Sequence, residues 1–184
     1  MSTFKSTANL TIISLLTIFG AASILYFSQT KPVESATIPQ EMHSLEFQKA
    51  FFAASRVYGR AGCGDQALAE MTARHAIETG LPPQVIAAMA ASESTCNPLA
   101  VSNRGAIGLM QTVPKIWSKE FDFSRINLFN PEDNMAVSTT IVSKLVKQYG
   151  LRNGLLRYYG TGNDGIGLGG AGYAEKVLQL AGKL

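Results

Sequence analysis

One stretch constrains the fold of this chain more than any other: a run of residues without a charge that ends in a glutamate. Pro82 and Pro83 open the run, and residues 84–93 read Gln-Val-Ile-Ala-Ala-Met-Ala-Ala-Ser-Glu. Proline fits the first turn of a helix, and a segment rich in alanine and without glycine favours helix over strand. The sequence therefore predicts a buried helix that carries Glu93 at its C-terminal end.

Glu93 lies seven residues after Ile86, four after Met89 and three after Ala90, so helical spacing puts the four side chains on one face. Removal from water raises the pKa of a carboxyl group, and the C-terminal end of a helix disfavours negative charge. A carboxyl group that stays protonated near neutral pH can donate a proton to a leaving-group oxygen. The alternative, a solvated glutamate at a helix end, stays open on spacing alone.

The residues after Glu93 predict a polar turn. Asn97 precedes Pro98, and the residue before proline is pushed out of the α region, so the helix stops there. Residues 102–105 read Ser-Asn-Arg-Gly and have the composition of a turn. Gly108 permits close approach of the backbone to a ligand, and from Gly108 to Gln111 the chain is predicted to enter a second helix. Read without a ligand, the segment is a glycine-rich connection between two helices.

Residues 93–114 resemble, without a gap, the signature of the SLT-type lytic transglycosylases, bacterial enzymes of the lysozyme-like superfamily that cut peptidoglycan. The shared pattern is Glu-Ser, then Asn-Pro-x-Ala-x-Ser, then Gly-Ala-x-Gly-Leu-Met-Gln-x-x-Pro. The resemblance implies a mainly α, lysozyme-like domain with little or no sheet. It also implies cleavage of the MurNAc–GlcNAc bond with formation of a 1,6-anhydromuramoyl end, and it implies no cofactor.

Carried over by position, the resemblance makes Glu93 the general acid and then the base. The chain departs from the family pattern in two places: Tyr159 begins Tyr-Gly-Thr-Gly where Tyr-Asn-Ala-Gly is usual, and Ser138 replaces a usual glycine. The spacing to Gly162 favours Tyr159 over Tyr158 as the hydroxyl that faces Glu93. The residues expected to bind the glycan are Ser102, Gly108, Met110, Gln111, Asn134, Tyr158 and Tyr159.

An apolar segment near the N-terminus predicts export. Residues 8–27 contain no charge and are about long enough to cross a bilayer as a helix, and Lys5 precedes them. A cleaved secretory signal is the alternative, because Ala21-Ala22-Ser23 offers small residues for cleavage. We therefore expect an anchor or signal at 1–27, a linker at 28–44 and a catalytic domain at 45–184. The expected location is the periplasm or cell envelope, at the inner membrane or secreted.

The two cysteines are expected to pair. In an exported chain, Cys63 and Cys96 suggest a disulfide, and free buried thiols are the alternative. Cys63, His75 and Cys96 follow no zinc-binding spacing, so no metal site is predicted. His75 is interpreted as a structural residue beside the core.

Further helices are expected from Leu45, from Asp65 to Thr79, from Asn130 to Gly150, over 155–159 and from about Gly172 onward. The glycine pattern at 165–170 matches a dinucleotide motif, but no strand precedes it, so it is interpreted as a loop. With 16 basic and 13 acidic residues, the chain is too balanced in charge for a nucleic-acid surface.

The expected partners are the peptidoglycan glycan strand, the inner membrane and a secretion or conjugation apparatus. Two alternatives to the transglycosylase remain: a lysozyme-like hydrolase that uses water as acceptor, and a non-catalytic wall-binding component of such an apparatus. Most glycosidases need a second carboxylate. The candidates lie in loops or at a helix start rather than in an apolar run: Glu120, Asp122, Glu132, Asp133 and Asp164.

Overall fold

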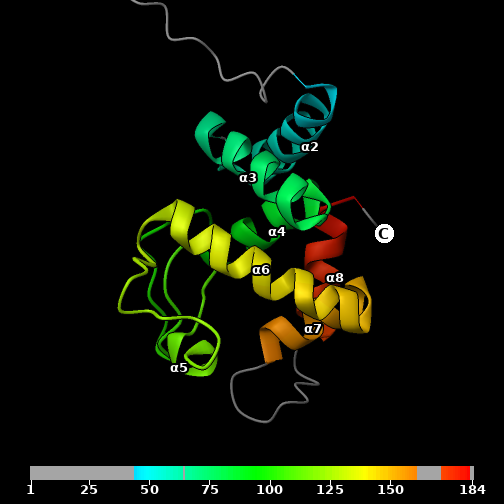
Figure 1. The fold of residues 1–184 in the computed structure, drawn as a ribbon. Coiled ribbons are helices and arrows are strands. Elements are labelled where there is room, and N and C mark those ends of the chain that lie inside the picture. The colour runs from blue at the N-terminus through cyan, green and yellow to red at the C-terminus, as the bar shows by residue number, and fades with distance from the viewer. Residues whose placement is uncertain (1–43, 64, 161–170, 183–184) are drawn as a thin grey trace, which may run out of the picture. The chain divides into compact units, whose positions relative to one another are not determined.

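The computed structural model describes residues 44–63, 65–160 and 171–182, and these residues are mainly helical (Figure 1). Apart from helices they contain turns and two isolated antiparallel bridges, Val101 with Ile107 and Ile107 with Thr112. The prediction of a mainly α fold with little or no sheet is confirmed. The helices, labelled as in Figure 1, are α2 (Leu45–Ala61), α3 (Gln66–Thr79), α4 (Pro83–Ser94), α5 (Pro114–Trp117), α6 (Pro131–Tyr149), α7 (Leu151–Gly160) and α8 (Ala171–Leu180).

Several expected features fall outside the described residues. They are the apolar segment at 8–27, the linker before Ser44 and the glycine-rich segment at 165–170. Among the residues that the structure does describe, no helix is both long and apolar enough to span a bilayer.

The charge-free run forms α4, which lies at the centre of the core. Residues 85–90 are all buried, and α4 packs against α2, α3 and α8. Burying a side chain such as Ile86 or Met89 contributes about 2 kcal/mol relative to leaving it in water. Because α4 has apolar neighbours along most of its length, its last turn and Glu93 are held in a fixed place.

Local sequence signals set the ends of the helices. The side chain of Asp65 accepts from the backbone N–H groups of Ala67 and Leu68 at the start of α3, and Gly80 ends α3 in the left-handed conformation. Asn130 caps α6 in the same way, through Glu132 and Asp133. These caps satisfy backbone donors that the first helical turn leaves without a partner.

The prediction that residues 108–111 enter a helix is wrong. Gly108 and Gln111 have positive φ angles of 79° and 54°, so the backbone turns instead. Ile107 and Thr112 then exchange two backbone hydrogen bonds, of 2.9 and 3.1 Å. Composition alone suggested a helix, whereas pairing across the turn satisfies the same backbone groups. Helix α5 begins only at Pro114.

Cys63 and Cys96 form the predicted disulfide, with their Cα atoms 5.9 Å apart. The bond joins the residue after the C-cap of α2 to the turn that follows α4. Thr95 and Cys96 both adopt left-handed backbone angles, φ 54° and 60°, which are uncommon for residues other than glycine. The disulfide therefore fixes an unusual turn two residues beyond Glu93.

Candidate active site

Glu93 lies in the last turn of α4 and is half-buried. Burial raises its pKa from 4.5 to about 7, while a hydrogen bond from Tyr173 and the positive charge of Lys176 lower it in part. Desolvation dominates because it penalises the ionised form directly. Near neutral pH, a substantial fraction of the Glu93 carboxyl groups therefore carry a proton.

Tyr173, on α8, is the aromatic neighbour that the sequence did not reveal. Its hydroxyl is buried and meets no partner at good hydrogen-bond geometry, yet it lies close enough to Glu93 to lower the carboxyl pKa by hydrogen bonding. Burial and the Glu93 charge both raise the pKa of Tyr173. The two observations agree if the contact is close but poorly aligned, as catalytic hydrogen bonds often are before substrate binds.

The two adjacent tyrosines of α7 differ in their surroundings. Tyr158 is buried, its hydroxyl donates to the carbonyl oxygen of Met110 at 2.8 Å, and burial followed by the Glu93 charge raises its pKa. Tyr159 is half-exposed and stacks on the Tyr173 ring, with centroids 4.7 Å apart. The Glu93 charge thus acts on both Tyr158 and Tyr173, and Tyr159 extends the aromatic surface toward solvent.

The turn after α4 is fastened to the helix that carries the acid. The Ser94 hydroxyl donates to the Leu109 carbonyl oxygen at 2.7 Å. The Ser102 hydroxyl accepts from the backbone N–H groups of Arg104 and Ala106, and the amide nitrogen of Gln111 donates to the carbonyls of Ala100 and Gly108. Residues 94–111 therefore form one hydrogen-bonded loop next to Glu93.

Asn134, fully buried on α6, holds this loop from inside. Its side chain accepts from the Met110 backbone N–H at 2.8 Å and donates to the carbonyls of Ile107 and Leu128 at 2.8 and 2.9 Å. The Met110 side chain is also fully buried. Both residues support the loop, and direct contact of either side chain with a glycan stays a prediction.

Gly108 is the tightest point of the loop. A Cβ atom there would collide with the Leu128 carbonyl oxygen and the Asn134 amide nitrogen, at a φ of +79° that side chains rarely adopt. We expect Gly108→Ala to lower the free energy of unfolding by about 2–3 kcal/mol, from overpacking plus backbone strain. Urea denaturation measures this. Gly105→Ala is the matched control: Gly105 has the same φ but nothing within 4 Å, so an equal loss in both variants would rule out the contact as the cause.

Ser138, which stands where the family usually has glycine, belongs to a buried hydroxyl cluster. Its hydroxyl and that of Thr112 are 2.6 Å apart. Hydrogen bonds with Ser138 and Thr112 lower the Tyr158 pKa and counteract part of the effect of burial. The serine at this position therefore supplies a hydrogen-bonding partner for Tyr158 that a glycine would lack.

A surface hollow of about 650 Å³ lies elsewhere, between residues 114 and 123, with Lys115, Lys119, Phe121 and Phe123 in its lining. Glu93 does not line it. The candidate site is the region around the Glu93 carboxyl group, because a titratable side chain whose pKa is strongly perturbed by burial marks a candidate functional site.

The acidic residues considered as a second carboxylate have partners of their own. Glu120 pairs with Lys144 at 2.7 Å, Asp122 accepts from Ser124, and Asp133 accepts from the Asn127 backbone N–H. Glu132 contacts Arg74 and His75, and Asp164 lies outside the described residues. Within the described ranges, no three His, Cys, Asp or Glu side chains are grouped so as to hold a metal ion.

The chain matches the model of the transglycosylase SLT domain over residues 70–167, more than half of its length. It belongs to the transglycosylase SLT domain family. The SLT match includes Glu93, the loop at 94–111 and both tyrosines of α7, and it ends before α8 begins. Tyr173 and Lys176 thus come from a helix beyond the matched segment.

Two curated relatives carry the name "Membrane-bound lytic murein transglycosylase C", from Yersinia pestis (strain Pestoides F) and Yersinia pseudotuberculosis serotype O:1b (strain IP 31758). Each is 35% identical to this SLT-domain chain over 96 residues, which is 47% of the chain and 27% of the relative. The match thus spans about a quarter of the length of these relatives. No solved structure matches significantly.

Proposed function

We propose that this chain is a peptidoglycan lytic transglycosylase in which Glu93 is the only catalytic carboxylate. The observation that carries the proposal is the Glu93 carboxyl group, half-buried in an apolar helix with a pKa of about 7, beside the buried Tyr158 and the half-buried Tyr173, whose hydroxyl is buried. Membership of the SLT family and the likeness to proteins named lytic murein transglycosylases support the same conclusion.

In the first step, Glu93 donates its proton to the oxygen of the MurNAc–GlcNAc bond. The bond from C1 of MurNAc to that oxygen breaks, and the acetamido oxygen of the same sugar closes onto C1. Glu93 is left as a carboxylate. The Lys176 charge and the Tyr173 hydroxyl, which both lower the Glu93 pKa, stabilise this ionised form.

In the second step, the Glu93 carboxylate takes the proton from the 6-hydroxyl of the same MurNAc. The oxygen attacks C1 and displaces the acetamido oxygen, which gives the 1,6-anhydro end and restores protonated Glu93. One group serves as acid and base because its pKa lies close to neutral pH. A second carboxylate is unnecessary, in keeping with the partners that the four described candidates, Glu120, Asp122, Glu132 and Asp133, already have.

The remaining expectations are part of the same proposal. Residues 45–184 are the catalytic domain, Ser102, Gln111 and Tyr159 contact the glycan at the rim of the site, and residues 1–27 attach or direct the chain to the cell envelope. The words "membrane-bound" in the names of the relatives favour an envelope location. Service to a secretion or conjugation apparatus remains an open proposal.

Digestion of purified sacculi tests the reaction. We expect soluble muropeptides with 1,6-anhydro ends, each one water molecule lighter by mass spectrometry than the reducing ends that a hydrolase leaves. Reducing ends alone would assign the hydrolase, and the release of no fragments would favour a wall-binding protein.

The pH profile is expected to follow Glu93. Its protonated form starts the reaction, so kcat/KM should fall as pH rises through about 7. Lys176→Met removes a charge that lowers the Glu93 pKa, so the falling limb should move to higher pH. Lys176→Arg keeps the charge and should leave the limb in place. A limb that stays where it is in Lys176→Met would show that this lysine does not act on the acid.

A further inference from the structure

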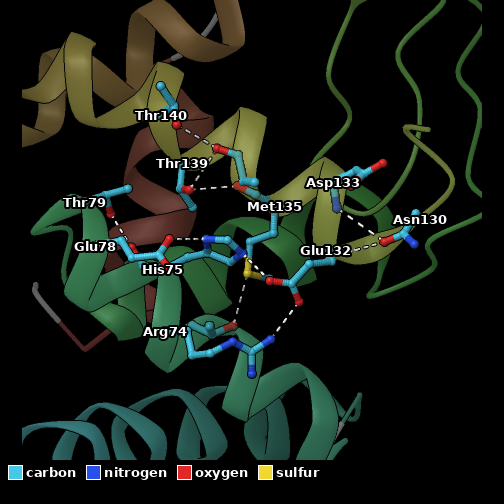
Figure 2. Close-up of polar contacts among 12 residues, drawn as sticks. Arg74, His75, Glu78, Thr79, Asn130, Glu132, Asp133, Met135, Thr139 and Thr140 are labelled. Atoms are coloured by element: carbon cyan, nitrogen blue, oxygen red, sulfur yellow. Dashed lines mark hydrogen bonds and ion pairs between the residues drawn. The ribbon is translucent and has the colours of Figure 1, made fainter. Parts of the chain in front are cut away.

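His75 is a buried titratable group that the proposed reaction does not use. Its ring lies between two carboxylates: Nδ1 is 3.0 Å from Glu78 Oε2, and Nε2 is 2.9 Å from Glu132 Oε1 (Figure 2). Glu132 also pairs with Arg74 through its other oxygen, at 2.7 Å. Glu78 and Arg74 come from α3, as His75 does, whereas Glu132 lies in the first turn of α6.

Hydrogen-bond chemistry determines the form of the ring. An ionised carboxylate only accepts hydrogen bonds, and a neutral imidazole has one N–H group. Both contacts are therefore satisfied at the same time only in the form of the ring that carries a hydrogen on each nitrogen. A neutral ring would set a nitrogen lone pair against a carboxylate oxygen at one of the two contacts, and that contact would be lost.

The first turn of α6 connects this ring to the loop of the candidate site. Asn134 stands two residues after Glu132, and its side chain makes the hydrogen bonds to Ile107, Leu128 and Met110. Between them, Asp133 accepts from the Asn127 backbone N–H at 3.0 Å. The Asn134 amide group lies directly against Gly108, where a Cβ atom would come within 2.3 Å of the amide nitrogen. A shift of this turn therefore moves the loop at 107–111.

We propose that His75, protonated on both ring nitrogens, is a positioning residue: it ties Glu132 to α3 and thereby sets the place of the loop that Asn134 holds. The two ring contacts of His75 go to Glu78 and Glu132, so the histidine acts through the loop and not on the reacting atoms. Its effect on substrate rests on the proposed function, whereas its protonation and its effect on the loop do not.

Nuclear magnetic resonance of the full chain with ¹⁵N-labelled histidine tests the protonation, with His43→Gln used to assign the second histidine. At pH 7 we expect both ring nitrogens of His75 to have the chemical shifts of protonated nitrogens. An unprotonated ring nitrogen at this pH overturns the proposal. This measurement needs no enzymatic activity, so it is independent of what the chain cleaves.

The link to the loop is tested with His75→Gln and Glu132→Gln, which keep side-chain volume and remove the charge. We expect faster hydrogen exchange at the Met110 amide with unchanged exchange in α4, and a rise in KM for soluble glycan strands of about threefold to tenfold at similar kcat. Glu70→Gln is the matched control, since Glu70 accepts from Gln66 on the same helix. If His75→Gln fails to fold, Glu132→Gln decides. Exchange at Met110 equal to wild type in a folded variant overturns the proposal.

Discussion

Replacing Glu93 by glutamine is expected to lower the rate of glycan cleavage by about 10³-fold, within the range typical of general acid–base catalysis. Glutamine has almost the same shape but no proton to give and none to take, so both proposed steps fail. The release of 1,6-anhydro fragments from sacculi, followed by mass spectrometry, measures the loss. Fragment release at the wild-type rate would remove Glu93 from the mechanism.

The stability of the same variant provides its control. The Glu93 pKa is raised from 4.5 to about 7 in the folded protein, so the folded state binds the proton more tightly than the unfolded state. Wild type therefore loses stability as pH rises from about 4.5 through 7, by about 3 kcal/mol at most. Glutamine does not ionise, so the Tm of Glu93→Gln should exceed that of wild type by more at pH 8 than at pH 5. An equal difference at both pH values would contradict the burial of the acid.

Removing the Cys63–Cys96 disulfide is expected to lower the free energy of unfolding by about 3–4 kcal/mol, because the unfolded chain regains the freedom of a long loop. The bond spans a sequence separation of 33 residues. It also holds Thr95 and Cys96 in left-handed angles just beyond Glu93. We therefore expect the double variant Cys63→Ser, Cys96→Ser to unfold at lower urea concentration.

Loss of the disulfide should also affect the acid. When the end of α4 frays, water reaches Glu93 and its pKa falls toward the ordinary value, so the falling limb of the pH profile should move to lower pH. Wild type treated with a thiol reductant is expected to behave like the double variant, and the double variant should not respond to the reductant. A variant that matches wild type in both stability and pH profile would show that the disulfide is dispensable.

Local sequence signals were enough to predict most of the helices. The charge-free run, the Asp65 and Asn130 caps and Gly80 predicted helices that the structure contains. The error at residues 108–111 has a physical cause: a tertiary contact decides that segment. The Asn134 side chain, more than twenty residues later, accepts the hydrogen bond from the Met110 N–H that a helix would have used. The sequence of residues 108–111 alone does not indicate this contact.

Only part of the candidate site was predictable from the sequence: the acid and the tyrosines of α7, but not the residues of α8. Glu93 and its apolar face follow from helical spacing, and Tyr158 and Tyr159 were both expected from the resemblance, with Tyr159 preferred as the hydroxyl that faces Glu93. Tyr173 reads in the sequence as one position of an apolar stripe on α8, and Lys176 as a surface charge. Eighty residues separate Tyr173 from Glu93, and only the packing of α8 against α4 brings the two together. Local periodicity does not contain such a contact.

Glu93 has neighbours from α4, α7 and α8, and α8 is the last of these three helices in the chain. During synthesis, Glu93 is therefore present in the chain before Tyr173 and Lys176, the two residues that lower its pKa. Until α8 packs against α4, neither Tyr173 nor Lys176 can act on the Glu93 carboxyl group. The proposed catalysis by Glu93 therefore requires that the last helix of the chain be in place.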